Sequence, residues 1–331
     1  MEKQSCISKY RTELMGISAI GVMLVHIPET ELCPWWLQRV LSWCGMGVYI
    51  FMFLSGVGLY YSMSARGKNG SLTDFYRRRL ERVILPYLLM AGIWYGITCL
   101  LVERNLWRFL YELSTISFWT EHSSPWFIAT LIPIYLLYPF YYRWIEKGNS
   151  GLKTLLLSAC VMVLVYTVFC LSEDLFNHLD QVLNSLWVFM LGSYYGKKVK
   201  QGSNLPELMV LFVAALLLTK LVPVPLVARF GQVILYATEG LFVMVVLALV
   251  MGCLHWERLW RILRWFGMHS LELYLTNQFL IKATWYFGMR DSKTGVQLYA
   301  MYAIIVFLGL LLSALLLPLE KRFAKILLNR G

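Results

Sequence analysis

Long apolar stretches alternate with short polar gaps along almost the whole chain. Ten such stretches can be separated, at 14–28, 40–61, 83–102, 126–142, 152–171, 182–196, 206–222, 232–254, 268–288 and 297–318. Most of them approach the roughly 20 residues that an α-helix needs to cross a bilayer, and those at 14–28 and 182–196 are the shortest. The pattern predicts an all-α fold, a polytopic transmembrane helix bundle of about ten spans.

Basic residues gather in alternate gaps between these stretches. If the N-terminus is cytoplasmic, most of the 30 Lys and Arg residues fall in inner segments, at 3–11, 66–82, 143–153, 197–200, 258–264 and 321–330. Short cytoplasmic loops of membrane proteins carry such an excess, so the charges predict that both ends of the chain are cytoplasmic. Membrane topology also accounts for the net charge of +11, which therefore does not indicate nucleic-acid binding.

The composition, 59% hydrophobic and 15% charged, is that of a membrane protein. No small-residue cleavage site follows Val25, so the first stretch is predicted to be a retained span and not a signal peptide. The seven cysteines are scattered without metal-binding spacing, so we expect no metal site. Because the gaps are short, residues 1–331 are predicted to form a single transmembrane domain.

Several polar side chains lie at the outer ends of the predicted spans. His26 follows Arg11 by fifteen residues, which places it roughly 22 Å along the first span. Glu239 and Lys282 come to a similar outer depth in the eighth and ninth spans. The loop EHSSPWF, which carries His122 and Trp126, enters the fourth span from the same side. Ionisable groups inside a membrane usually mark a site or a pathway, so these residues are functional candidates.

A second polar group lies at the cytoplasmic side, in FYRRRLERVILPY. Arg78, Arg79 and Arg82 precede the third span, and a spacing of three places Arg79 and Arg82 on one face of an α-helix. Paired guanidinium groups suit phosphate oxygens, although basic residues at the inner end of a span are also what topology alone requires. Glu272, near the inner end of the ninth span, could pair with one of these arginines or face a cavity.

Five ordered segments resemble one known family. They are GISAIGVMLVHI, FMFLSGVGLYYS, FYRRRLERVILPY, SPWFIATLIPIYLLYP and FGMHSLELYLTNQF. Together they are similar to the acyltransferase-3 family of integral-membrane acyltransferases, over about Arg11 to Pro318. The resemblance implies transfer of an acyl group, most often acetyl, from cytoplasmic acyl-CoA to a hydroxyl of an extracytoplasmic glycan or glycolipid. It also implies a location in the bacterial plasma membrane.

The resemblance also implies roles for particular residues. The first-span histidine, His26 here, is the catalytic residue, and the RxxR element, Arg79 and Arg82 here, is associated with the acyl donor. Two positions depart from the family pattern. Met15 stands where many members have an arginine, whose role could be absent or filled by Arg11 or Glu13. Asn277 stands where a histidine often follows the SLE-YL element.

Acyl transfer to a hydroxyl explains why polar groups lie at both faces. A neutral imidazole can take the hydroxyl proton as the oxygen attacks the thioester, while the arginines hold the charged end of CoA on the inner side. Asn277, Tyr274 or Trp126 could donate hydrogen bonds to the developing oxyanion. An acyl-histidine intermediate and direct attack both fit the sequence.

Most of these residues also have an alternative interpretation, in which their role is structural. Ser55 could line a donor channel or, with Gly56, only allow close helix packing. Glu239 and Lys282 could orient the catalytic or acceptor groups or could form an ion pair with each other. Trp126 could stack on a sugar or be an ordinary interfacial aromatic residue. For the whole chain, the alternative function is a carbohydrate or lipid-linked-glycan transporter or flippase.

Overall fold

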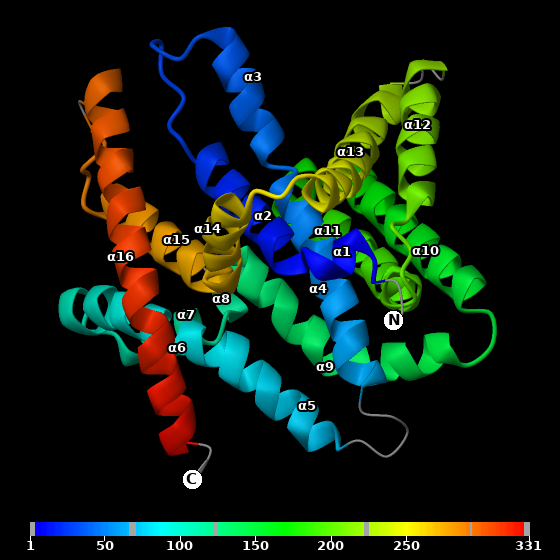
Figure 1. Cartoon of the computed structure of the whole chain (residues 1–331). Coiled ribbons are helices and arrows are strands. Elements are labelled where there is room, and N and C mark those ends of the chain that lie inside the picture. Colours follow the sequence, from blue (N-terminus) through cyan, green and yellow to red (C-terminus); the bar gives the residue numbers. More distant parts are fainter. Residues whose placement is uncertain (1–3, 66–70, 122–124, 222–224, 292, 328–331) are drawn as a thin grey trace. The chain divides into compact units, whose positions relative to one another are not determined.

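A computed structural model describes residues 4–65, 71–121, 125–221, 225–291 and 293–327. Every regular element among these residues is a helix, which confirms the predicted all-α fold (Figure 1). The helices belong to two compact units, each assembled from stretches that are separate in the sequence. Unit 1 comprises Met1–Gly21, Gly45–Gly70 and Tyr138–Gly267, and unit 2 comprises Val22–Cys44, Ser71–Leu137 and Met268–Gly331.

Unit 1 is built on a close pair of long helices. Its elements are α1 (Cys6–Lys9), most of α2 (Arg11–Val25), α4 (Gly47–Ser64), the second part of α9 (Trp126–Glu146), α10 (Ser150–Leu171), α11 (Glu173–Lys200), α12 (Pro206–Leu221), α13 (Pro225–Cys253) and α14 (Glu257–Met268). Helices α4 and α11 approach so closely that a Cβ atom added to Gly56 would lie 2.2 Å from the Phe189 carbonyl oxygen. Gly56 therefore serves helix packing, as small residues do at membrane helix interfaces.

Unit 2 contains the remaining helices. They are α3 (Trp35–Cys44), α5 (Leu72–Arg79), η1 (Leu80–Ile84), α6 (Leu85–Tyr95), η2 (Gly96–Val102), α7 (Leu106–Leu113), α8 (Ile116–Glu121), the first part of α9, α15 (Ser270–Tyr286) and α16 (Gly295–Leu327), together with the last turn of α2. Elements η1 and η2 are π-helical. Helix α15 packs against both α16 and α6, and this arrangement positions the candidate site.

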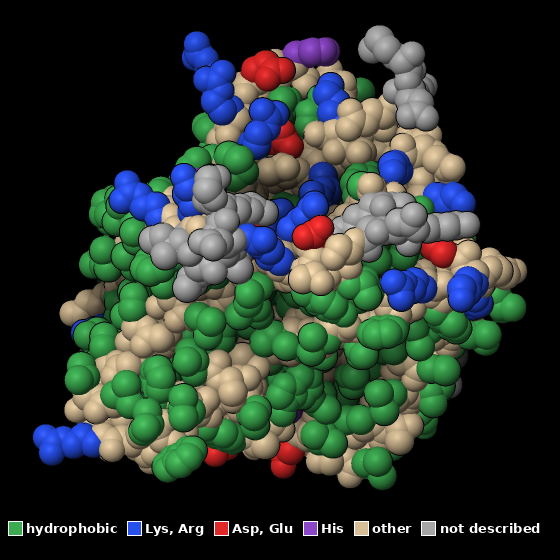
Figure 2. Space-filling view, turned by 90° about the horizontal axis from the view of Figure 1, so that it is seen from below, with side chains coloured by type: hydrophobic (Ala, Val, Ile, Leu, Met, Phe, Trp, Pro, Cys, Tyr) green, Lys and Arg blue, Asp and Glu red, His purple; other side chains and the backbone are tan. Residues whose placement is uncertain are grey.

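Within the described residues, five helical segments are long and apolar enough to cross a membrane by length and composition. They are Trp35–Ser64, Leu72–Val102, Ser150–Leu171, Ile234–Cys253 and Gly295–Phe323. Hydrophobic side chains also cover much of the surface seen in Figure 2, as contact with lipid requires. The other five expected spans coincide with helices that do not meet both criteria, so the number ten and the cytoplasmic location of both ends stay predictions.

Arg11 and Glu13 lie near Met15, the position at which many family members have an arginine, and both have partners in unit 1. Glu13 is buried and accepts hydrogen bonds from Arg264 Nε at 2.9 Å and Nη2 at 2.6 Å. Arg11 Nη1 donates to the Leu54 carbonyl oxygen at 3.4 Å. Met15 itself is buried in the apolar core. The two charged residues are thus engaged in the packing of unit 1.

Candidate active site

His26 lies directly after the last residue of α2, Val25, and is half-buried. The helix therefore ends earlier than the expected span 14–28, and His26 stands in the following turn, where its backbone N–H donates to the Met23 carbonyl at 3.2 Å. Its ring has a partner on each nitrogen. Nδ1 lies 2.6 Å from the Val22 carbonyl oxygen, and Nε2 lies 3.2 Å from Nε2 of Gln278 on α15.

These two contacts define the chemistry of the imidazole. A carbonyl oxygen can only accept a hydrogen bond, so in the neutral ring Nδ1 carries the hydrogen and donates it to Val22. Nε2 is then the basic nitrogen, and its lone pair accepts from the Gln278 amide. These contacts make Nε2 the ring nitrogen that can take up a proton.

The segment around His26 is anchored to α16. Tyr302 donates a hydrogen bond from its hydroxyl to the Met23 carbonyl, and Thr30 donates to the Tyr299 hydroxyl at 2.7 Å. Asn277 Nδ2 donates to the Tyr302 hydroxyl at 3.5 Å. Asn277, predicted as a catalytic residue, is therefore linked through Tyr302 to Met23, near the end of α2. Its neighbour Gln278 contacts the His26 ring itself. The buried Oδ1 atom of Asn277 has no hydrogen-bond partner among the described residues.

Helix α15 carries a line of polar residues through the apolar interior of unit 2. Tyr274, Gln278 and Lys282 are spaced by four residues and so share one face of the helix. The Tyr274 ring packs against the Phe127 ring, with centroids 5.3 Å apart. Phe127 follows the predicted substrate contact Trp126, the first residue of α9. Sequence reasoning missed Gln278, although the spacing of polar residues within an apolar stretch could have revealed it.

Glu272 lies in the first turn of α15, at the opposite end of the helix from Lys282. Glu272 is buried and interacts electrostatically with Arg82 and with Glu320 on α16. Gln278 lies six residues further along α15, which is about 9 Å along a helix axis.

The arginine segment contains a π-helical turn where a regular α-helix was expected. Residues Leu80–Ile84 form η1, and the Leu85 N–H donates to the Leu80 carbonyl five residues earlier. Pro86 gives the physical reason, because proline has no N–H and its ring clashes with the carbonyl four residues before it, here that of Arg82. Single π turns of this kind are frequent at functional sites.

The arginines of this segment have different surroundings. The Arg79 guanidinium lies between two aromatic rings, 5.5 Å from the Phe75 centroid and 5.6 Å from the Tyr135 centroid. Arg78 and Arg82 are exposed. Arg77, which was not among the predicted site residues, forms an ion pair with Glu81 at 3.4 Å. Arg79 therefore makes cation–π contacts with both rings, while Arg78 and Arg82 are exposed.

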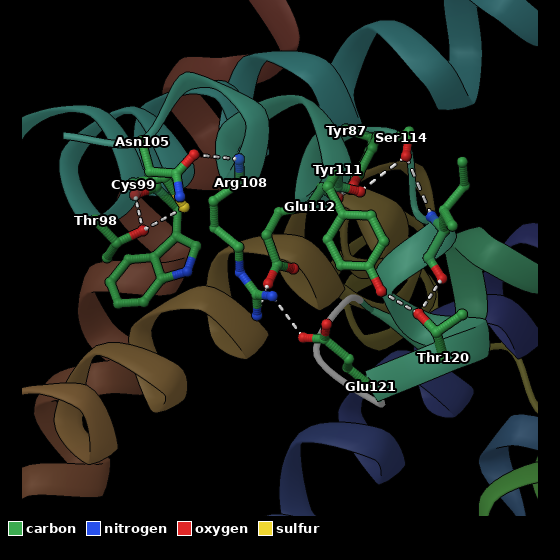
Figure 3. Close-up of polar contacts among 12 residues, drawn as sticks. Tyr87, Thr98, Cys99, Asn105, Arg108, Tyr111, Glu112, Ser114, Thr120 and Glu121 are labelled. Carbon is green, nitrogen blue, oxygen red and sulfur yellow. Dashed lines mark hydrogen bonds and ion pairs between the residues drawn. The ribbon is translucent and has the colours of Figure 1, made fainter. Parts of the chain in front are cut away.

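A second charged cluster joins the hairpin of α7 and α8 (Figure 3). Arg108 bridges Glu112 at 2.7 Å and Glu121 at 2.5 Å, and this hydrogen bond with Glu121 raises the pKa of the guanidinium. Glu112 is almost fully buried and interacts electrostatically with Lys282. Lys282 thus has Glu112 as an electrostatic partner within unit 2. Neither Arg108 nor Glu112 was predicted from sequence, although their i, i+4 spacing indicates an ion pair.

Three predicted residues lie outside the described part of unit 2. Ser55 and Glu239 are half-buried in α4 and α13, and both belong to unit 1. His122 lies outside the described residues. Unit 2 therefore brings together His26, Arg78, Arg79, Arg82, Trp126, Glu272, Tyr274, Asn277 and Lys282.

Comparison with protein families identifies the class of the protein. The family model described as acyltransferase domain matches residues 14–318, nearly the whole chain. The chain belongs to the acyltransferase-3 family and is a membrane acyltransferase. Comparisons with curated proteins and with solved structures give no significant match.

Proposed function

We propose that this protein is an integral-membrane O-acyltransferase of the bacterial plasma membrane. It moves an acyl group, acetyl in the main case, from cytoplasmic acyl-CoA to a hydroxyl of an extracytoplasmic glycan or glycolipid. The observation that carries the proposal is the path along α15. At one end of that path Glu272 interacts electrostatically with Arg82, and at the other Gln278 contacts the His26 ring, about 9 Å further along the helix axis.

His26 is the general base of this reaction. Its Nδ1–H donates to the Val22 carbonyl, so Nε2 is the nitrogen that takes the proton of the acceptor hydroxyl. The hydroxyl oxygen attacks the thioester carbon, the new C–O bond forms and the C–S bond breaks. The proton then passes from Nε2 to the CoA thiolate. Asn277 supports the base through Tyr302 and the helix end at Met23. Glu239 is proposed as an orienting group.

The donor is held at the inner end of unit 2. Arg78 and Arg82 present exposed guanidinium groups, and Arg79 is fixed between Phe75 and Tyr135. Guanidinium groups bind phosphate oxygens through paired, charge-assisted hydrogen bonds, so these residues suit the phosphates of CoA. Glu272 orients Arg82, and Ser55 is proposed to line the path of the acyl chain.

The acceptor approaches from the other end of α15. Lys282 lies four residues beyond Gln278 and interacts with the buried Glu112. With Trp126, His122 and Tyr274 it forms the proposed substrate contacts. Hydroxyl-rich sugars bind through such combinations of charged side chains and aromatic faces, so these residues suit a glycan.

Ester formation by purified protein tests this function. The wild-type protein in detergent, given acetyl-CoA and a de-esterified envelope glycan, should release CoA thiol and form glycan ester in equal amounts. Thiol release is followed with a thiol-reactive dye, and the ester by mass spectrometry. Free CoA in place of acetyl-CoA is the control. A protein that moves the glycan across a vesicle membrane while the thioester stays intact would be a transporter and would contradict the proposal.

A further inference from the structure

The Gln278 amide contacts Nε2 of His26, the atom that must receive the proton of the acceptor hydroxyl. His26 and Gln278 are 252 residues apart in the sequence, yet their side-chain nitrogens lie 3.2 Å apart. Nε2 of a neutral imidazole has one lone pair, which accepts one in-line hydrogen bond. An acceptor hydroxyl that gives its proton to Nε2 needs that same place, so it must displace the amide first.

We propose that Gln278 holds the place of the acceptor hydroxyl on His26 in the resting site and thereby suppresses hydrolysis of the acyl donor. This inference rests on the proposed function. A water molecule on Nε2 would be activated as a glycan hydroxyl is: its oxygen would form the C–O bond, the C–S bond would break, and its proton would pass through Nε2 to the CoA thiolate. The products would be free carboxylic acid and CoA.

The position of Gln278 suits this role. It is half-buried on α15, on the face that also carries Tyr274 and Lys282, and therefore lies between the predicted substrate contacts. Its neighbour Asn277 cannot act in the same way, because its amide nitrogen donates to Tyr302. A glycan bound by Lys282 and the aromatic residues brings its hydroxyl with many other contacts, which offset the loss of one amide hydrogen bond. Water brings no such contacts.

The expected change in hydrolysis follows from the strength of the hydrogen bond between Gln278 and His26, which water would have to replace. A neutral hydrogen bond changes an equilibrium by roughly twofold to tenfold. Removal of the amide should therefore raise the ratio of acyl-CoA hydrolysis to glycan acylation by roughly that factor.

The test compares Gln278→Ala and Gln278→Asn with wild-type protein in detergent, using acetyl-CoA with and without the envelope glycan. Thiol release, free acetate and glycan ester are measured together. Both variants should show the raised ratio, and the smaller Asn change keeps the test valid if the Ala variant does not fold. The additional change His26→Ala should remove the extra hydrolysis. Gln297→Ala is the matched control, because Gln297 is exposed and its side chain accepts from the nearby Thr294 N–H.

An unchanged ratio in catalytically active Gln278 variants would overturn the role of Gln278. Extra hydrolysis that persists without His26 would also overturn it, since the water would then be activated elsewhere. The proposed function is judged separately, by ester formation in the wild-type protein. The two failures are therefore distinguishable.

Discussion

Replacement of His26 by alanine should reduce the rate of acyl transfer by about 10²- to 10⁴-fold, the usual contribution of a positioned general base. The variant loses the group whose Nδ1–H is held by the Val22 carbonyl and whose Nε2 meets Gln278. Alanine removes no charge from the arginine segment. The affinity for CoA should therefore stay near that of the wild-type protein, and the loss should appear in kcat.

The matched control for this prediction is His255→Ala. His255 is exposed and belongs to unit 1, so its removal should leave transfer unchanged. His26→Gln gives a further comparison, because its amide can make hydrogen bonds but cannot take up a proton at neutral pH. Both His26 variants should show this loss of rate in the ester-forming assay. Transfer by His26→Ala at the wild-type rate would contradict the assignment of the base.

The double variant Arg79→Ala with Arg82→Ala should bind CoA about 10- to 100-fold more weakly. Hydrogen bonds to charged groups contribute roughly 1.5–3 kcal/mol, and about 1.4 kcal/mol corresponds to a tenfold change in affinity. Because Arg82 is exposed, the expected loss of CoA binding free energy is smaller than the sum of two buried, charged hydrogen bonds. Calorimetric titration of the detergent-solubilised protein with CoA measures it directly.

Two comparisons separate donor binding from membrane topology. Arg143→Ala with Lys147→Ala removes the same charge from another predicted inner segment and should leave the affinity for CoA unchanged. Arg79→Lys keeps the charge but loses the planar group between Phe75 and Tyr135, so it should weaken binding by an intermediate amount. If the double arginine variant binds CoA as tightly as the wild-type protein, these arginines serve topology alone.

The sequence predicted the fold class and most of the residues that unit 2 brings together. Apolar length and loop charge are strong signals, since lipid forces the backbone to bond within each helix. They do not determine helix ends, and α2 stops at Val25, so His26 lies in a turn. The π turn at Leu80–Ile84 was missed because an i, i+3 spacing presumes a regular helix, although Pro86 is a sequence signal for its disruption.

Contacts between distant segments were the least accessible from sequence. The family pattern drew attention to Asn277, yet the side chain on the His26 ring is that of the next residue, Gln278. Which of two neighbours on α15 meets the ring depends on the rotation of that helix about its axis. Glu112 was missed for a related reason, because only its burial distinguishes it from an ordinary surface carboxylate.

The central claim is that an acyl group enters at the arginines and leaves at His26 on the opposite face of the membrane. Proteoliposomes with the protein in one orientation, acetyl-CoA only on the side of the arginine segment and envelope glycan only on the other side, test it most directly. The account predicts glycan ester on the far side, with no acetyl-CoA appearing there, and none with His26→Ala. Ester formed only when donor and acceptor share one side would contradict it.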